Sequence, residues 1–156
     1  MHAFLVSTGL IALAEIGDKT QILSLMLAAR FRRPVPIVFG ILAATIANHA
    51  AAGLVGALFG SLFAGPWLRW ILGASFLGVA VWALVPDKFE ESTDPIGRSG
   101  AFAATLLAFF LAEIGDKTQI ATIGLAARFA AFLPVVLGTT CGMMLANIPA
   151  VIIGDR

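Results

Sequence analysis

The sequence predicts an all-α integral membrane protein, and three observations support this fold class. Of its 156 residues, 60% are hydrophobic and only 12% are charged, whereas soluble domains average about 45–50% apolar and about 25% charged residues. The apolar runs reach the roughly 20 residues that a helix needs to cross a bilayer, and the alternation typical of barrel strands is absent. An eight-residue polar motif occurs twice within these runs, 98 positions apart, so the chain contains an internal repeat.

We expect five membrane-spanning helices, separated by short loops that contain arginine, proline or glycine. Their bounds are 3–29, 36–60, 67–85, 100–127 and 132–153. The longest polar stretch, residues 87–99, is interpreted most simply as a solvated linker. It divides the chain into a first repeat of three helices, residues 1–86, and a second repeat with two helices, residues 100–156.

The two repeats are expected to be inverted relative to each other in the membrane. Three helices precede the second repeat, so its first helix crosses in the direction opposite to that of residues 3–29. If the loop 30–33 is cytoplasmic, that side carries six basic residues and the other side carries two. The positive-inside rule then places the N-terminus outside and the loops 30–33 and 87–99 in the cytoplasm. Many secondary transporters have inverted repeats, with a binding site near the midplane.

The repeated motif, AEIGDKTQ, occupies residues 14–21 and 112–119. On a continuous helix, Glu15, Asp18 and Lys19 share one face. Gly17, like Gly115 in the second copy, permits either a close helix contact or a local unwinding of the helix. A charged residue at the bilayer centre costs about 2.5–3.5 kcal/mol on insertion scales, so these side chains are expected to face inward. Thr20 and Thr118 are expected to point away from that face and to bond back to the preceding turn. The equivalent charged residues of the second copy are Glu113, Asp116 and Lys117.

Together the two motifs carry a net charge of −2. The four carboxylates are those of Glu15, Asp18, Glu113 and Asp116, and the two ammonium groups are those of Lys19 and Lys117. One divalent cation or two protons would balance this charge, which is a physical basis for exchange. The alternative is that each group of acids and lysine is a buried brace between helices, and the lysines are expected to pair with nearby acids.

The candidate ligands favour a hard or intermediate cation. Carboxylate oxygens, with the amide oxygens of Gln21 and Gln119, suit Ca²⁺, Mn²⁺ or Mg²⁺ better than Zn²⁺ or Cu⁺. Asn48 and Asn147 are expected to form hydrogen bonds between helices, with ion ligation as the alternative. His49 is either a hydrogen-bonded packing residue or a proton relay.

Other functions are less compatible with the composition. A net charge of +1 gives no reason to expect nucleic-acid binding. The single cysteine, Cys141, excludes an intrachain disulfide and a site with several cysteines. A lone His49 and a lone Cys141 offer no nucleophile–base pair, so we do not expect an enzyme.

Two E-x-G-D-K-[ST] motifs, at 15–20 and 113–118, resemble those of the UPF0016 family, also called the GDT1 family of cation transporters. The resemblance covers essentially the whole chain, and GTTCGMMLANIPAVIIG at 138–154 also looks like the second-repeat helix of the family. It implies a proton-coupled exchanger of Mn²⁺ and/or Ca²⁺ whose cation site is formed by the acids of both motifs. The metal is then the transported substrate, and no resident cofactor is expected. Bacterial relatives are associated with manganese export, which implies a bacterial inner membrane.

The family has three helices in each repeat, and the sequence ends where a counterpart of helix 67–85 would follow. We therefore expect a sixth helix to be missing or truncated. The expected partners are a divalent cation, protons and the lipid bilayer, and a homo-oligomer is left open. Two alternatives remain at this point: an exporter of another small cationic substrate, and a membrane assembly protein that transports nothing.

Overall fold

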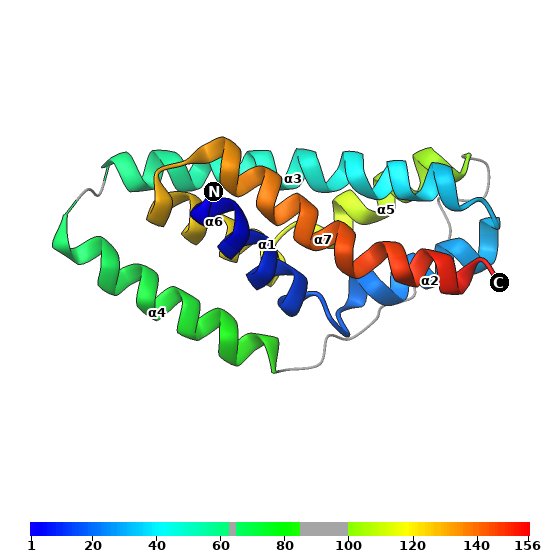
Figure 1. The fold of residues 1–156 in the computed structure, drawn as a ribbon, viewed down its shortest axis with the longest axis horizontal. Helices are drawn as coiled ribbons and strands as arrows, with labels where there is room; N and C mark the ends of the chain where they lie inside the picture. The colour runs from blue at the N-terminus through cyan, green and yellow to red at the C-terminus, as the bar shows by residue number, and fades with distance from the viewer. Residues whose placement is uncertain (63–64, 85–99) are drawn as a thin grey trace.

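The computed structural model describes residues 1–62, 65–84 and 100–156, and the predicted linker 87–99 lies outside them. Within these ranges the chain forms helices and no strands, which confirms the all-α prediction (Figure 1). The seven helices are α1 (His2–Ala14), α2 (Lys19–Phe31), α3 (Pro34–Leu62), α4 (Pro66–Ala83), α5 (Ala101–Glu113), α6 (Lys117–Phe129) and α7 (Phe132–Gly154).

Both copies of the motif interrupt a helix, whereas we expected five continuous helices with either a close helix contact or a local unwinding at Gly17 and Gly115. The expected continuous helices 3–29 and 100–127 are each divided, into α1 and α2 and into α5 and α6. Gly17 and Gly115 lie at the two breaks with φ of +77° and +74°, a conformation that glycine adopts without the steric cost of a Cβ. The prediction was wrong because it relied on the length of the apolar run, which is the same for a broken and an unbroken helix.

The residues after each glycine start the next helix. Asp18 is the N-cap of α2, and its carboxylate accepts a hydrogen bond of 3.5 Å from the Thr20 N–H. The Gly17 N–H donates to Oε1 of Gln21 at 3.0 Å. Such caps satisfy N–H groups that would otherwise have no partner. In the second copy, Asp116 occupies the N-cap position of α6 but its side chain makes no capping hydrogen bond, while the Gly115 N–H donates to Oε1 of Gln119 at 2.9 Å.

Each long helix packs along the broken pair from the other half of the chain. Helix α3 contacts α5 and α6, whereas α7 contacts α1 and α2, and the two long helices also contact each other. Among the described residues, α3 and α7 are the two helices long and apolar enough to cross a membrane. Helix α4 lies at the edge of the bundle against α6 (Figure 1).

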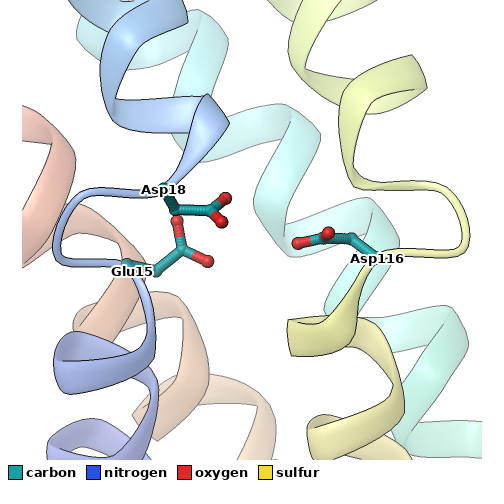
Figure 2. A group of neighbouring side chains, drawn as sticks. All are labelled: Glu15, Asp18 and Asp116. Atoms are coloured by element: carbon teal, nitrogen blue, oxygen red, sulfur yellow. The ribbon is translucent and has the colours of Figure 1, made fainter. Parts of the chain in front are cut away.

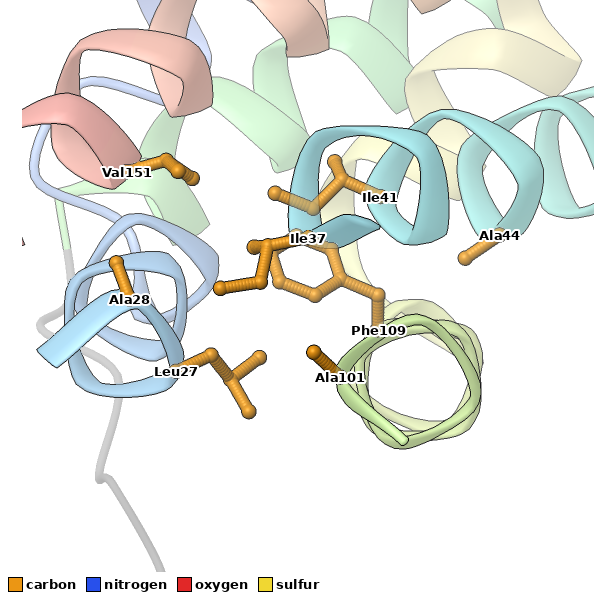
Figure 3. Close-up of a cluster of buried hydrophobic side chains, with 8 residues drawn as sticks. All are labelled: Leu27, Ala28, Ile37, Ile41, Ala44, Ala101, Phe109 and Val151. Atoms are coloured by element: carbon orange, nitrogen blue, oxygen red, sulfur yellow. The ribbon is translucent and has the colours of Figure 1, made fainter. Parts of the chain in front are cut away.

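The two broken pairs run antiparallel to each other. At one end, the His2 ring at the start of α1 lies 5.7 Å from the Phe129 ring at the end of α6. At the other end, Leu27 and Ala28 near the end of α2 share a buried cluster with Ala101 at the start of α5 (Figure 3). The remaining members of that cluster are Ile37, Ile41, Ala44, Phe109 and Val151. The breaks in the two pairs are therefore brought to the same level of the bundle.

Many polar and charged side chains are buried and many large apolar side chains are exposed, which is unusual for a water-soluble domain. Large apolar side chains such as Leu13, Trp67 and Leu77 are exposed. The buried set contains carboxylates, an ammonium group, amides and many hydroxyls. Charged residues are almost never buried in soluble proteins unless they are paired, and in membrane proteins they face the interior of the bundle. The exposed apolar surface is of the kind that lipid accepts, and the buried charges must compensate one another.

Candidate cation site

The two helix breaks bring three carboxylates together in the core. Glu15, Asp18 and Asp116 are all buried, and one oxygen of each lies within 4.8 Å of the others. Figure 2 shows Glu15 and Asp18 on one break, directed towards Asp116 on the opposite break. Residues 98 positions apart in the sequence thus form one cluster, which is arranged as a candidate cation site.

Two ion pairs cross between the motifs. Nζ of Lys19 lies 2.9 Å from Oδ1 of Asp116, and Nζ of Lys117 lies 2.5 Å from Oδ1 of Asp18. The side chain of Lys117 is 5% exposed and that of Lys19 is 26% exposed. The predicted pairing of the lysines with acids is confirmed, and the pairs named here link one motif to the other.

The motif threonines face the carboxylates. The Thr20 hydroxyl donates to Oε2 of Glu15 at 2.5 Å and also lies 3.4 Å from Oδ2 of Asp18. The Thr118 hydroxyl donates to Oδ2 of Asp116 at 3.2 Å. The prediction that these hydroxyls point away from the acids was wrong, since it assumed an uninterrupted helix, and the break rotates the residues after Gly17 relative to those before it.

Glu113 lies outside the cluster of three carboxylates. Its Oε1 accepts a hydrogen bond of 3.1 Å from the Thr45 hydroxyl, and its Oε2 lies 3.9 Å from Nε2 of His49. The difference from Glu15 has a local origin: α5 continues through Glu113, whereas α1 ends at Ala14 and leaves Glu15 in the break. The sequence predicted four equivalent acids, whereas the structure places three of them in one cluster. The fourth, Glu113, contacts the side chains of Thr45 and His49 on α3.

The two motif glutamines hold the breaks together. Their amide oxygens, expected among the cation donors, accept the N–H groups of Gly17 and Gly115 instead. The Gln21 amide also donates through Nε2 to the Ala146 carbonyl of α7 at 3.1 Å. In this arrangement Gln21 and Gln119 act indirectly, because they fix the backbone at Gly17 and Gly115, next to Asp18 and Asp116.

The two asparagines connect helices, as predicted. Nδ2 of Asn48 on α3 donates to the Phe110 carbonyl of α5 at 3.1 Å. Oδ1 of Asn147 on α7 accepts from the Ser24 hydroxyl of α2 at 2.7 Å. Sequence reasoning missed Ser24 and Thr45. The available signal was their spacing: Ser24 lies one helical turn after Thr20, and Thr45 lies one turn before His49, so each shares a helix face with a candidate site residue.

Comparison with known proteins identifies the class of protein. A family model described as "Divalent cation/proton antiporter GDT1" matches residues 3–91 and 101–156. The chain belongs to the GDT1 family. The resemblance inferred from the two motifs is thereby confirmed, and GDT1 proteins are transporters rather than enzymes.

Individual GDT1 relatives cover most of the chain. A Vibrio cholerae protein named "Putative manganese exporter" is 50% identical over 155 residues, which are 99% of this chain and 77% of that protein. A GDT1-like protein of Synechocystis is 32% identical over 151 residues, 81% of this chain and 71% of its own length. GDT1-like protein 5 of Arabidopsis thaliana is 27% identical over 192 residues, 99% of this chain and 83% of its own length. No solved structure matches the chain.

Proposed function

We propose that this GDT1 protein exchanges Mn²⁺ and/or Ca²⁺ for protons, and that the cation is bound between the two helix breaks. Glu15, Asp18 and Asp116 would bind it, with Glu113 beside them. The observation that carries the proposal is the convergence of three buried carboxylates from both motifs, with oxygens within 4.8 Å of one another. Carboxylates this close repel one another unless a cation or protons lie between them.

The charge of the site supports exchange rather than simple binding. Four carboxylates and two ammonium groups leave a net charge of −2 in a surrounding of apolar helices. Uncompensated buried charge is strongly unfavourable. One divalent cation neutralises the site, and two protons also do so. A site that is stable with either load and unstable with neither couples the movement of the two.

The ligand chemistry supports the choice of ions. Carboxylate oxygens are preferred by Ca²⁺, Mg²⁺ and Mn²⁺. The name of the Vibrio cholerae relative, a manganese exporter, supports Mn²⁺ as one of the substrates. The cation is cargo in this scheme, so the site must also release it, and the lysines beside Asp18 and Asp116 limit how tightly it is held.

We propose further that the two repeats form an inverted pair. Equivalent contacts support this: Gly40 lies against Thr105 and the Phe102 carbonyl, as Gly138 lies against Ser7 and the Phe4 carbonyl, 98 positions away in each case. The same holds for Gly56 against Ile123 and Ala126, and for Gly154 against Leu25 and Ala28. In such an arrangement α2 and α6 begin near the midplane, where the positive ends of their dipoles face the carboxylates.

The proposed topology has five crossings. The broken pairs α1–α2 and α5–α6 would each cross once, and α3, α4 and α7 would supply the other three crossings. The first repeat is then residues 1–86 and the second is residues 100–156. The loop charges favour an external N-terminus, with the loops 30–33 and 87–99 in the cytoplasm. A bacterial inner membrane is the location proposed.

Transport by the purified protein in liposomes tests the function. With an acid interior and a neutral exterior, external Mn²⁺ or Ca²⁺ should accumulate inside as protons leave, and dissipation of the pH gradient should stop accumulation. Mn²⁺ or Ca²⁺ flux that does not depend on the pH gradient would contradict proton exchange. Inhibition of uptake by excess arginine would favour another small cationic substrate. Absence of flux for every cation would favour an assembly role.

A further inference from the structure

We infer that His49 donates a nitrogen ligand to the transported cation and thereby favours Mn²⁺ over Ca²⁺. The inference rests on the proposed function and concerns the same site. The motif carboxylates are suitable ligands for both Mn²⁺ and Ca²⁺, and the imidazole of His49 on α3 would make the site selective between them.

The two ring nitrogens of His49, Nδ1 and Nε2, are buried and have no hydrogen-bond partner among the described residues. The side chain as a whole is 1% exposed. The expectation that His49 is a hydrogen-bonded packing residue was therefore wrong. Buried polar groups are almost always hydrogen-bonded, and leaving one unsatisfied is costly. An imidazole retained in this condition points to a ligand that uses its nitrogen.

The distance to Glu113 suits a shared cation better than a hydrogen bond. Nε2 of His49 lies 3.9 Å from Oε2 of Glu113, beyond the roughly 2.7–3.2 Å of an N–H···O bond. Two donor atoms that each bind one cation at about 2.0–2.3 Å can be separated by up to about 4.5 Å. The Thr45 hydroxyl occupies the other oxygen of Glu113, Oε1, which leaves Oε2 available towards His49. That oxygen also has no hydrogen-bond partner among the described residues.

The second repeat shows that packing does not require this imidazole. The residue equivalent to His49, 98 positions later, is Asn147. Its amide is fully used: Oδ1 accepts from Ser24, and Nδ2 donates to the Met143 carbonyl at 3.1 Å. The side of the site next to Asn147 is thus closed by hydrogen bonds, whereas the side next to His49 has free donor atoms. The two halves of the repeat therefore differ in chemistry at this position.

A single imidazole among carboxylates discriminates between divalent ions. Ca²⁺ and Mg²⁺ are bound in proteins through oxygen, whereas neutral imidazole is a common ligand of transition metals. Mn²⁺ is a transition metal that is also suited to carboxylates. Glu113 and His49 lie outside the cluster of three carboxylates, and there they would offer the transported cation one oxygen and one nitrogen, a combination that accepts Mn²⁺ and places Ca²⁺ at a disadvantage.

Competition between the two ions tests the inference in transport. His49→Asn installs the residue of the other repeat, and His2→Asn, on the exposed histidine at the start of α1, is the matched control. The ratio of Mn²⁺ flux to Ca²⁺ flux should fall at least about tenfold in His49→Asn. Metal affinity typically falls by about this factor even when only a residue that hydrogen-bonds to a metal ligand is replaced. The flux ratio should not change in His2→Asn. An unchanged ratio in His49→Asn would overturn the inference, while a wild-type protein that moves neither ion would overturn the proposed function instead.

A spectroscopic test needs no transport, and its first measurement uses the wild-type protein alone. Pulsed electron paramagnetic resonance of Mn²⁺ bound to the wild-type protein should show coupling to a directly bound ¹⁴N nucleus. The coupling should persist in His2→Asn and disappear in His49→Asn. Wild-type protein that binds Mn²⁺ without such coupling would refute the role of His49 and leave the carboxylate site standing.

Discussion

Nζ of Lys19 lies 2.9 Å from Oδ1 of Asp116, so an ammonium group of the first motif neutralises a carboxylate of the second. Lys117 and Asp18 form the reciprocal pair. These two pairs link the two breaks and reduce the net charge of the carboxylate cluster. In the proposed site, the lysines would therefore contribute both to its assembly and to its charge.

Removal of Lys117 should destabilise the protein more than removal of Lys19. The side chain of Lys117 is 5% exposed and that of Lys19 is 26% exposed. Removing one partner of a buried pair typically costs about 3–5 kcal/mol, because the other charge stays buried. We expect Lys117→Met to approach this value and Lys19→Met to lose less. Unfolding of the detergent-solubilised variants, followed by tryptophan fluorescence, measures both.

The double variant Lys117→Met with Asp18→Asn is the control for that experiment. It removes the buried charge that Lys117→Met leaves behind, so part of the lost stability should return. Two results would contradict a buried pair between Lys117 and Asp18. One is equal stability of Lys117→Met and Lys19→Met. The other is a double variant whose loss of unfolding free energy exceeds the summed losses of Lys117→Met and Asp18→Asn.

Substitution of Gly17 by alanine should destabilise the first break through the backbone alone. Its φ is +77°, and a Cβ built there meets no atom within 4 Å. Placing an L-residue in this region costs roughly 1–2 kcal/mol, so Gly17→Ala should lower the unfolding free energy by about that amount. Gly9→Ala is the matched control, since Gly9 lies within α1 and also has free space around it. A loss of stability in Gly9→Ala as large as in Gly17→Ala would show that conformation is not the cause.

Single cysteines should report the proposed topology. In a Cys141→Ser background, Arg33→Cys and Asp155→Cys should react with a membrane-impermeant maleimide only after cells are permeabilised. Gly65→Cys, at the start of α4, should react in intact cells. All three positions lie at the ends of helices, outside the broken pairs. Labelling of Arg33→Cys in intact cells would reverse the orientation, and labelling of all three from one side would contradict five crossings.

The charge of the site predicts the number of protons exchanged. A net charge of −2 is balanced by two protons or one divalent cation, so transport should be electroneutral. Mn²⁺ uptake into liposomes at a fixed pH gradient should then be unaffected by a potassium diffusion potential of either sign. Uptake that responds strongly to the potential would mean that the number of protons differs from two.

The sequence was sufficient to predict an all-α protein and the convergence of acids from the two motifs. Glu15, Asp18 and Asp116 were predicted to meet because the motif is duplicated and because charge in an apolar segment must be compensated. Asn48 and Asn147 were predicted as links between helices for a similar reason. These predictions depend on composition and on repetition, which are visible without any knowledge of packing.

The helix breaks and the details of the site needed the structure. Gly17 followed by Asp18 is a local signal for the end of one helix and the cap of the next, but the long apolar run outweighed it. Once the break is missed, the direction of Thr20 is wrong as well. The different positions of Glu15 and Glu113 accompany a difference in the backbone, since α5 continues one residue further than α1, and identical motifs conceal this difference.

Mn²⁺ and Ca²⁺ exchange by four single variants in proteoliposomes tests the central claim most directly. The variants are Glu15→Gln, Asp18→Asn, Glu113→Gln and Asp116→Asn, each checked for a monodisperse, folded state. The control is Asp155→Asn, at the end of α7. The proposed site predicts a loss of at least about tenfold in each of the four, since each removes a charge that the cation balances, and wild-type flux in the control. Undiminished exchange in all four variants would contradict it.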